Sequence, residues 1–464
     1  MRSVIFTALV CAALSPLRAD ERPNVLVILC DDIGAHELSL YGHPKHQTPV
    51  LDELGKTGVW FTTGYSTPIC HTTRFEIMTG QYAHHNGVYH FPNRPGGPPA
   101  NTGPDDIGSH LTFGKLFQQA GYATAHAGKW QLSGEHPTLI HECGFDEYCM
   151  WAYTHNLPEG VTHDGAWEGK PGGKTCRYWH PSIVQNGKYL DTDDDSYGPD
   201  IYSDFILDFV QRHPEDPFFV YYPMALTHGQ FFTTPDTTET IKDRFQHSPR
   251  KNWQANVQYT DKIIGKLIDG LESMGRRENT LVIFVGDNGS SGNGKAKTTE
   301  MGCRVPFIVN SPNLVKPSGE CRELVDLSDI VPTICEVASI ELPEDHIIDG
   351  VSFAPYLQGD MTPLRDWIYA PLGGKRVVRT KRYLLENNSP TNFGQLYDCG
   401  ESRDGSGYVD ITEDESAEAK QARQMMLEIL ADKPVPNVAQ KKPAAAKKKG
   451  KKAKSTSSVK AAAK

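Results

Sequence analysis

The chain has 464 residues, of which 38% are apolar and 22% are charged, and its formal net charge is −10. This composition is typical of a folded globular protein, and the length allows one large domain or two moderate ones. It excludes a wholly disordered chain, and no apolar run reaches the roughly 18 residues that a membrane-spanning helix needs.

The first 19 residues have the pattern of a secretory signal peptide. Arg2 supplies the positive charge, residues 4–14 are apolar, and Leu17-Arg18-Ala19 provides a cleavage site. We therefore expect a chain that is secreted or periplasmic and begins at residue 20 after cleavage. In such an oxidising compartment some of the nine remaining cysteines could pair, and the best local candidates are Cys143, Cys149 and Cys176.

Strand-like and helix-like segments alternate along most of the chain. Apolar runs predict strands at 24–30, 218–222 and 280–285, and helical periodicity occurs at 111–119, 201–211, 257–274 and 327–338. The alternation predicts an α/β fold with a large mixed, mostly parallel sheet sandwiched by helices.

Two of the predicted strands end in polar pairs. Asp31-Asp32 follows the first strand, and Asp287-Asn288 follows the strand at 280–285. Ligands of open α/β sheets bind outside the carboxyl ends of the strands, so these side chains predict one shared site. An oxygen-only ligand set suits hard cations, and Ca²⁺ tolerates irregular coordination better than Mg²⁺, which stays possible.

The segment from Ser66 to Gly80 places a thiol at a loop-to-helix junction. Cys70 precedes Arg74 by four residues and an apolar-periodic run follows. Backbone N–H groups and the helix dipole favour negative charge at such a helix start, and an arginine is suited to holding an oxyanion.

After residue 366 the sequence pattern changes to short runs of alternating polar and apolar residues. Short alternating runs at 367–370, 375–379, 381–385 and 394–398 predict a small antiparallel sheet, and a helix is expected at about 415–430. We expect this C-terminal unit to span 367–432.

Residues 433–464 form a Lys/Ala-rich tail that cannot bury a core, so we expect disorder there. Ten lysines and no acidic residue lie in 441–464, which leaves about −20 for residues 1–440. The tail either keeps the chain soluble or docks on a polyanion such as a sulfated polysaccharide or an acidic cell surface. Nucleic acid is not expected as a partner.

The motif Cys70-His-Thr-Thr-Arg74, with Thr79-Gly80 after it, resembles the sulfatase signature Cys-x-Pro-Ser-Arg followed by Leu-Thr-Gly. The sulfatase family belongs to the alkaline-phosphatase-like superfamily, and the resemblance covers roughly residues 22–430. It implies an arylsulfatase-like hydrolase that acts on a sulfate ester of a sulfated carbohydrate, with residues 20–366 as the catalytic domain. It also implies a maturation enzyme that oxidises Cys70 to formylglycine.

The resemblance implies a role for each further motif. Divalent cation ligands would be Asp31, Asp32, Asp287, Asn288 and the modified Cys70. The implied catalytic residues are Cys70 as the nucleophile precursor, Arg74, Lys129 and Lys295 around the sulfate, and His228 as the acid for the leaving alcohol. Residues implied to line the pocket are Gln131, Thr154, His155 and Lys297, the last as a substitute for Lys295.

The implied mechanism starts from the hydrated aldehyde of formylglycine, one oxygen of which attacks sulfur. The alcohol leaves with a proton from His228 or a lysine, and the second hydroxyl then expels sulfate. A free thiol could not complete that last step.

Two positions depart from the family pattern. Thr72 stands where the signature has proline, and Gln131 stands where a Gly-Lys-Trp-His segment has its histidine. An amide holds a hydrogen bond but takes no proton, so either His71 or His155 substitutes, or turnover is slow, or the chain has left catalysis. The departures and the basic tail suggest one alternative, a non-catalytic protein that binds sulfated glycans. A second alternative is a phosphodiester or phosphonate hydrolase on the same scaffold, which would share the metal and the nucleophile.

Overall fold

The structure is a computed structural model that describes residues 22–91, 106–132, 140–152, 177–240, 244 and 248–436. The expected signal peptide, Thr154, His155, Cys176 and the Lys/Ala-rich tail lie outside the described residues. Within the described ranges no helix combines the length and the apolar character needed to cross a bilayer.

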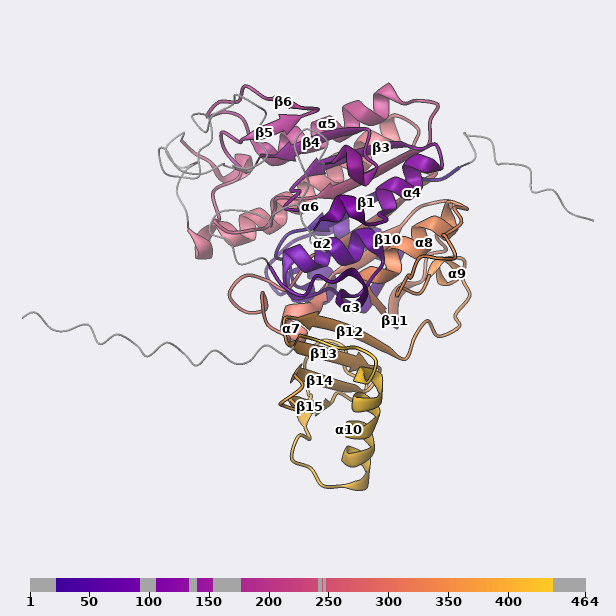
Figure 1. Cartoon of the computed structure of the whole chain (residues 1–464). Coiled ribbons are helices and arrows are strands. Elements are labelled where there is room, and N and C mark those ends of the chain that lie inside the picture. Colours follow the sequence, from indigo (N-terminus) through magenta and orange to yellow (C-terminus); the bar gives the residue numbers. More distant parts are fainter. Residues whose placement is uncertain are drawn as a thin grey trace, which may run out of the picture.

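A large mixed sheet forms the centre of the molecule (Figure 1), in the order β11-β2-β10-β8-β1-β7-β3-β4-β5-β6 with β9 beside β2. Five consecutive strands, β8, β1, β7, β3 and β4, are parallel, which confirms the predicted α/β class. The strands are Asn24–Cys30 (β1), Val59–Tyr65 (β2), Ala123–Gly128 (β3), Glu147–Trp151 (β4), Ile183–Gln185 (β5), Lys188–Tyr189 (β6), Phe218–Pro223 (β7), Thr280–Gly286 (β8), Arg304–Val305 (β9), Phe307–Asn310 (β10) and Gly319–Asp326 (β11).

The first strand shows why the sheet needs helices on both faces. Every residue of β1 is buried, and alternate side chains belong to two separate apolar clusters. One cluster is completed by α2 (Cys70–Thr79), α4 (Phe113–Gln119) and α8 (Ile330–Val337). The other is completed by α1 (Pro49–Thr57), α5 (Gly198–Arg212) and α6 (Pro249–Ser273).

Helix α6 begins eight residues before the apolar periodicity does. Its first residue is Pro249, which is well placed at the start of a helix because it has no N–H to leave unpaired. Shorter pieces complete the part of the chain that precedes residue 367: α3 (Ala83–Asn86), α7 (Glu300–Cys303), α9 (Ala354–Leu357), and the 3₁₀ turns η1 (Ala35–Glu37), η2 (Ser39–Tyr41), η4 (Ile107–Ser109), η5 (His141–Cys143), η8 (Pro235–Thr237) and η10 (Leu327–Asp329).

Of the three cysteines that are the best candidates for pairing, Cys143 and Cys149 form no disulfide with each other. Both side chains are buried, and no disulfide occurs among the eight cysteines that the structure describes. Cys143 ends η5 in one apolar cluster, whereas Cys149 lies in β4 and faces the other cluster. Because the sheet separates the two side chains, proximity in sequence does not bring the sulfur atoms together.

The C-terminal unit is the predicted small antiparallel sheet with one helix. Its strands are Trp367–Leu372 (β12), Lys375–Thr380 (β13), Tyr383–Asn388 (β14), Gln395–Asp398 (β15) and Val409–Asp410 (β16), and the helix is Ala417–Leu430 (α10). Figure 1 shows this unit below the large sheet, with α10 lying alongside the strands. Ser416 caps α10, and Ala422, Met426 and Leu430 pack on the sheet.

Candidate active site

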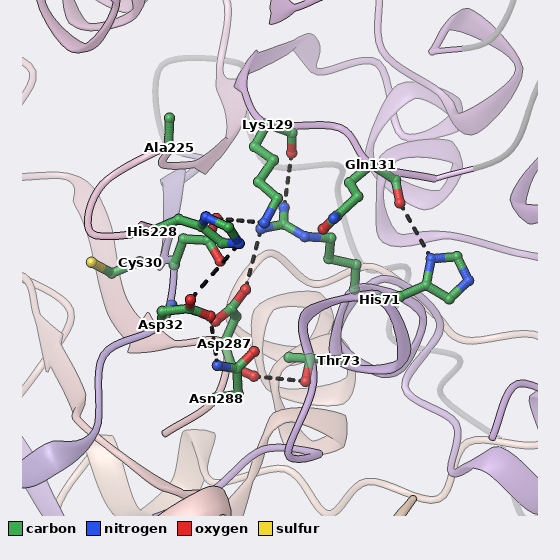
Figure 2. Close-up of polar contacts among 12 residues, drawn as sticks. Cys30, Asp32, His71, Thr73, Lys129, Gln131, Ala225, His228, Asp287 and Asn288 are labelled. Atoms are coloured by element: carbon green, nitrogen blue, oxygen red, sulfur yellow. Dashed lines mark hydrogen bonds and ion pairs between the residues drawn. The ribbon is translucent and has the colours of Figure 1, made fainter. Parts of the chain in front are cut away.

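The carboxyl ends of four neighbouring parallel strands meet at one edge of the large sheet. β1 leads into Asp31-Asp32 and β8 into Asp287-Asn288, and the two strands pair in register up to Cys30 and Gly286. Lys129 follows β3, and His228 lies shortly after β7. Figure 2 shows the labelled side chains from these strand ends pointing toward one another, as the sequence predicted.

The acidic residues form a fully buried cluster. The Asp32 backbone N–H donates to Asp287 Oδ1 at 2.8 Å, and Asn288 Nδ2 donates to Asp32 Oδ1 at 2.8 Å. Asp32 has a φ of +57°, a left-handed conformation that non-glycine residues seldom adopt. Such backbone strain is kept where the surroundings hold a residue in place, as they do at functional sites.

Three cations surround the carboxylates. Lys129 Nζ lies 2.5 Å from Asp31 Oδ2, and Lys295 Nζ lies 2.6 Å from Asp32 Oδ1. Burial raises the pKa of Asp31, but Lys129, Lys295 and then Arg74 outweigh it and hold that pKa at about 2. For Lys295, burial acts against the charged form, yet Cys70, Asp32 and Asp31 raise its pKa above the ordinary value.

Arg74 ties the start of α2 to two strand ends. Its Nη1 donates to the Lys129 carbonyl at 2.8 Å, and its Nη2 lies 3.3 Å from Asp287 Oδ2. The guanidinium is completely buried, so its charge is screened little by water. Arg74 therefore both positions Lys129 and compensates the negative charge of Asp287.

Lys297 lies outside this cluster although it is only two residues from Lys295. Its Nζ donates to the Asn293 carbonyl at 2.7 Å in an exposed contact. Among the described residues, Lys297 therefore makes no contact with the acidic cluster that would let it substitute for Lys295.

Cys70 is the first residue of α2 and is 2% exposed. Burial raises the pKa of its thiol, and Lys129 and Lys295 offset this only in part. Thr73 Oγ1 donates to the Asp287 carbonyl at 2.7 Å, which fixes this helix start against the end of β8. A buried, protonated thiol is a poor nucleophile, so the cysteine as such is unsuited to attack.

The oxygen cluster fits a divalent cation. Asp31 Oδ1 and Asn288 Oδ1 are buried and have no hydrogen-bond partner among the described residues. Ligand atoms of Asp31, Cys70 and Asp287 all lie within 4.8 Å of one another. A buried oxygen without a partner is costly, and a cation bound between these oxygens would satisfy both.

His228 stands at the edge of the cluster with its ring held by the backbone. Nδ1 contacts the Gly229 carbonyl, so it carries the proton, and Nε2 lies 3.8 Å from Asp32 Oδ2. Burial lowers the pKa of His228 well below its ordinary value, and the charges of Arg177 and Lys129 lower it further. Nε2 is therefore an unprotonated acceptor in this form of the protein.

Gln131 also has a left-handed backbone, with a φ of +52°. Its carbonyl lies 3.3 Å from His71 Nδ1, a contact drawn in Figure 2. Its side-chain Oε1 is buried and has no partner among the described residues. The amide oxygen can therefore accept a hydrogen bond, but the amide group cannot act as a general acid or base.

Sequence reasoning missed three residues at this site. Ser291 Oγ donates to Asp32 Oδ2 at 2.8 Å, and Thr73 holds the carbonyl of Asp287. Both lie within or next to the quoted motifs, so hydroxyl groups near those motifs were the available signal. Arg177, whose guanidinium stacks 4.2 Å from the Trp151 ring, belongs to no motif and only the fold brings it near His228.

The sulfatase family profile matches residues 23–340 of this chain. The chain belongs to the sulfatase family. Members hydrolyse sulfate esters, so the chain is a sulfuric ester hydrolase of the arylsulfatase-like type, and the family uses a formylglycine and a divalent metal.

Curated sulfatases resemble the chain over most of its length. It is 28% identical to an arylsulfatase of Hemicentrotus pulcherrimus over 78% of this chain and 67% of the relative. It is 27% identical to the N-acetylgalactosamine-6-sulfatase of Canis lupus familiaris over 89% and 81%, respectively. An ulvan-active sulfatase of Formosa agariphila is 28% identical over 79% and 66%.

Solved structures share the fold. The PsFucS1 sulfatase from Pseudoalteromonas sp. superposes with a TM-score of 0.68 at 20% identity, covering 89% of this chain and 91% of that one. At this identity the likeness concerns the fold alone.

Proposed function

We propose that this protein is a secreted sulfatase that hydrolyses a sulfate ester on a sulfated carbohydrate, using a formylglycine derived from Cys70 and a bound Ca²⁺. The observation that carries the proposal is the buried cluster of Asp31, Asp32, Asp287 and Asn288, which adjoins Cys70 and has two oxygens without hydrogen-bond partners in the described part of the chain. Mg²⁺ is the alternative cation, because the oxygen ligands suit both ions.

The carbohydrate part of the proposal rests on the relatives. Their names specify N-acetylgalactosamine-6-sulfate or ulvan as the sulfated material, and one structural neighbour was solved with its substrate D-glucosamine-2-N,6-O-disulfate. We infer the same substrate class for this chain, without assigning the sugar or the sulfate position.

The cationic side chains would hold the sulfate group. Lys129 and Lys295 already contact the two aspartates of β1, so a sulfate placed beside the cation would meet their ammonium groups. Arg74 keeps Lys129 in position through its carbonyl. Prearranged charges of this kind lower the barrier because they need no reorganisation as charge develops.

His228 would move the proton of the leaving alcohol. A bound sulfate ester brings negative charge close to the ring, which raises the pKa of the imidazole. Nε2 then holds a proton and gives it to the leaving oxygen, while Nδ1 stays on the Gly229 carbonyl. The formylglycine supplies the nucleophilic hydroxyl and the metal supplies Lewis-acid polarisation when both are present.

Maturation would precede folding. Cys70 and Thr72 are each 2% exposed in the folded chain, so a maturation enzyme could not reach them there. We propose that the enzyme acts on the unfolded segment and accepts threonine at position 72.

We keep the expected boundaries as part of the proposal: a signal peptide over 1–19, the catalytic domain over 20–366, the C-terminal sheet and helix over 367–432, and a tail over 433–464.

The glycan-binding alternative is favoured by one observation, the amide of Gln131 at a position where a base would exchange protons.

The test is sulfate release from a panel of sulfated monosaccharides and polysaccharides, with aryl phosphonate esters as a comparison. We expect sulfate release by the natural chain and none by Cys70→Ala or Asp287→Ala. Circular dichroism of each variant verifies that it is folded. Binding of the sulfated sugars without any release would support the glycan-binding alternative, and faster phosphonate cleavage would support the phosphonate hydrolase.

A further inference from the structure

We propose that a crevice between the catalytic unit and the C-terminal unit binds a sugar unit of a glycan, at a site separate from the sulfatase centre. The crevice has a volume of about 440 Å³, which lies within the usual range for small-ligand sites. Six of the residues that line it carry the inference: Tyr41, Trp60, Arg304, Glu320, Arg322 and Arg403. The proposal is independent of the sulfatase reaction.

The wall on the catalytic side is aromatic. Tyr41 and Trp60 meet edge to face, with their ring centroids 5.0 Å apart, and both rings are partly exposed. The Tyr41 hydroxyl donates to the Phe61 carbonyl at 3.0 Å and accepts from the Phe307 N–H at 2.8 Å. These bonds hold the ring in place, and a fixed aromatic face is a surface on which the apolar side of a sugar can stack at little entropic cost.

Donors and acceptors stand beside the aromatic wall. Arg304 is 8% exposed, its Nε donates to the Thr62 carbonyl at 2.8 Å, and its guanidinium lies 5.8 Å from the centroid of the Tyr41 ring. Glu320 is exposed beside it, so the crevice lining contains both donors and acceptors for hydroxyl groups.

The opposite wall comes from the loop after β15. Arg322 reaches across to this loop, contacting the Glu401 carbonyl and lying 3.7 Å from its carboxylate. Arg403 Nη1 donates to the Ser402 carbonyl at 3.0 Å. Burial lowers the pKa of Arg403, and the nearby cations Arg379 and Arg322 lower it further, so several guanidiniums are crowded here.

These groups fit a polyhydroxylated ligand better than a simple ion. The lining also includes Glu401 and Asp404, so cationic and anionic side chains are equal in number, and no net positive charge selects an anion. Sugar hydroxyls both donate and accept, and they can bond to arginine and carboxylate groups at once. The side chains of Glu401 and Arg322 are 95% and 50% exposed, so a glycan chain can reach the crevice from solvent.

The crevice shares no lining residue with the catalytic cluster. Its lining comes from η2, β2, β9 and β11 on one side and from the loop after β15 on the other. A glycan bound there would be held on the protein whether or not another part of the same glycan is being hydrolysed.

The experiment is calorimetric titration of the full chain with unsulfated hexasaccharides from chondroitin, agarose and xylan. We expect at least one of them to bind, and the double variant Glu320→Ala/Arg322→Ala to weaken that binding at least fivefold. Both residues are surface groups, so the variant should fold. Trp60→Leu should weaken binding at least tenfold, as loss of the stacking surface predicts.

The matched control is Arg382→Ala, which removes a paired arginine of similar exposure, 49%, elsewhere on the C-terminal unit. It should change the Kd less than twofold, and KM for an aryl sulfate should stay within twofold in the double variant. Absence of binding by all three sugars would overturn the proposal. Unchanged binding by the double variant would also overturn it, because the contact of Arg322 with Glu401 would then serve only to connect the two units.

Discussion

Lys295 and Lys297 have the same side chain two positions apart, but their surroundings differ. Lys295 contacts Asp32 in the buried cluster, whereas Lys297 contacts loop carbonyls at the surface. Lys295→Ala should lower kcat/KM for a sulfate ester by about 10² or more, the scale on which loss of a prearranged charge acts. Lys297→Ala is the matched control and should change it less than about threefold. Equal losses in both variants would contradict the assignment.

Cys70 should be the precursor of the nucleophile. It forms no disulfide among the described residues and begins α2 beside the acidic cluster. In active protein, mass spectrometry of the Cys70 peptide should show a loss of about 18 Da relative to the thiol, as conversion of thiol to aldehyde requires. An unmodified thiol in fully active protein would refute this role.

Gln131 should have a structural rather than an acid–base role. Its backbone is left-handed and contacts His71, and its buried side-chain oxygen can accept a bond from a nearby hydroxyl. Gln131→His should therefore change kcat by less than about tenfold, which corresponds to about 1.4 kcal/mol. A gain of about 10² at neutral pH would instead show that a base is missing, since that is the usual scale of general base catalysis.

At the scale of elements, a carboxylate connects β14 to α7. Glu386 Oε1 accepts the Glu300 N–H at 2.7 Å, and burial, followed by the charge of Glu300, raises the pKa of Glu386 to about 7. Because this pKa is above the value of an unfolded chain, the group's contribution to stability is present below about pH 4.5 and is lost as pH rises through about 7.

Glu386→Gln keeps the acceptor oxygen and removes the ionisation. At pH 8 it should therefore be more stable than the natural chain by about 1–2 kcal/mol, and at pH 5 the difference should largely vanish. Urea unfolding at both pH values measures this. Glu323→Gln, which alters a carboxylate paired with Lys381, is the control and should show no such gain at pH 8. If the free energy of unfolding of Glu386→Gln differed from that of the natural chain by the same amount at both pH values, the ionisation effect would be excluded.

At the scale of the whole molecule, the cation should link the active site to overall stability. Three buried carboxylates lie together where β1 and β8 end, at the carboxyl edge of the sheet, and burial and Asp31 raise the pKa of Asp287 well above its ordinary value. Anything that binds the folded state alone stabilises it, so chelation should lower Tm by several degrees and abolish sulfate release.

Added Ca²⁺ should restore Tm and activity at lower concentration than Mg²⁺, because carboxylate-rich irregular sites suit Ca²⁺ better. Calorimetric scans of chelated protein with each ion measure this. The variant Asp287→Asn should lose most of the ion-dependent rise in Tm. Full activity and an unchanged Tm after exhaustive chelation would rule the metal site out.

The local signals in the sequence were sufficient for the fold class and for the main cluster. Short apolar runs such as 24–30 predict strands buried on both faces, and the polar pairs that end such strands are expected at the carboxyl edge of a parallel sheet. For that reason Asp31, Asp32, Asp287 and Asn288 could be grouped before any coordinates, as could the antiparallel sheet and helix that follow residue 366.

Other features depend on contacts between residues far apart in the chain. Sequence spacing favoured Lys295 but left Lys297 as a possible substitute, and only the path of the loop after β8 directs one ammonium to Asp32. The separation of Cys143 from Cys149 follows from the sheet that lies between them, and the place of Arg177 near His228 follows from the packing of two loops. Residue types and periodicity thus determine which elements form and which groups end them. Side-chain direction, burial and charge pairing arise only when the elements pack, because those properties belong to pairs of residues rather than to single positions.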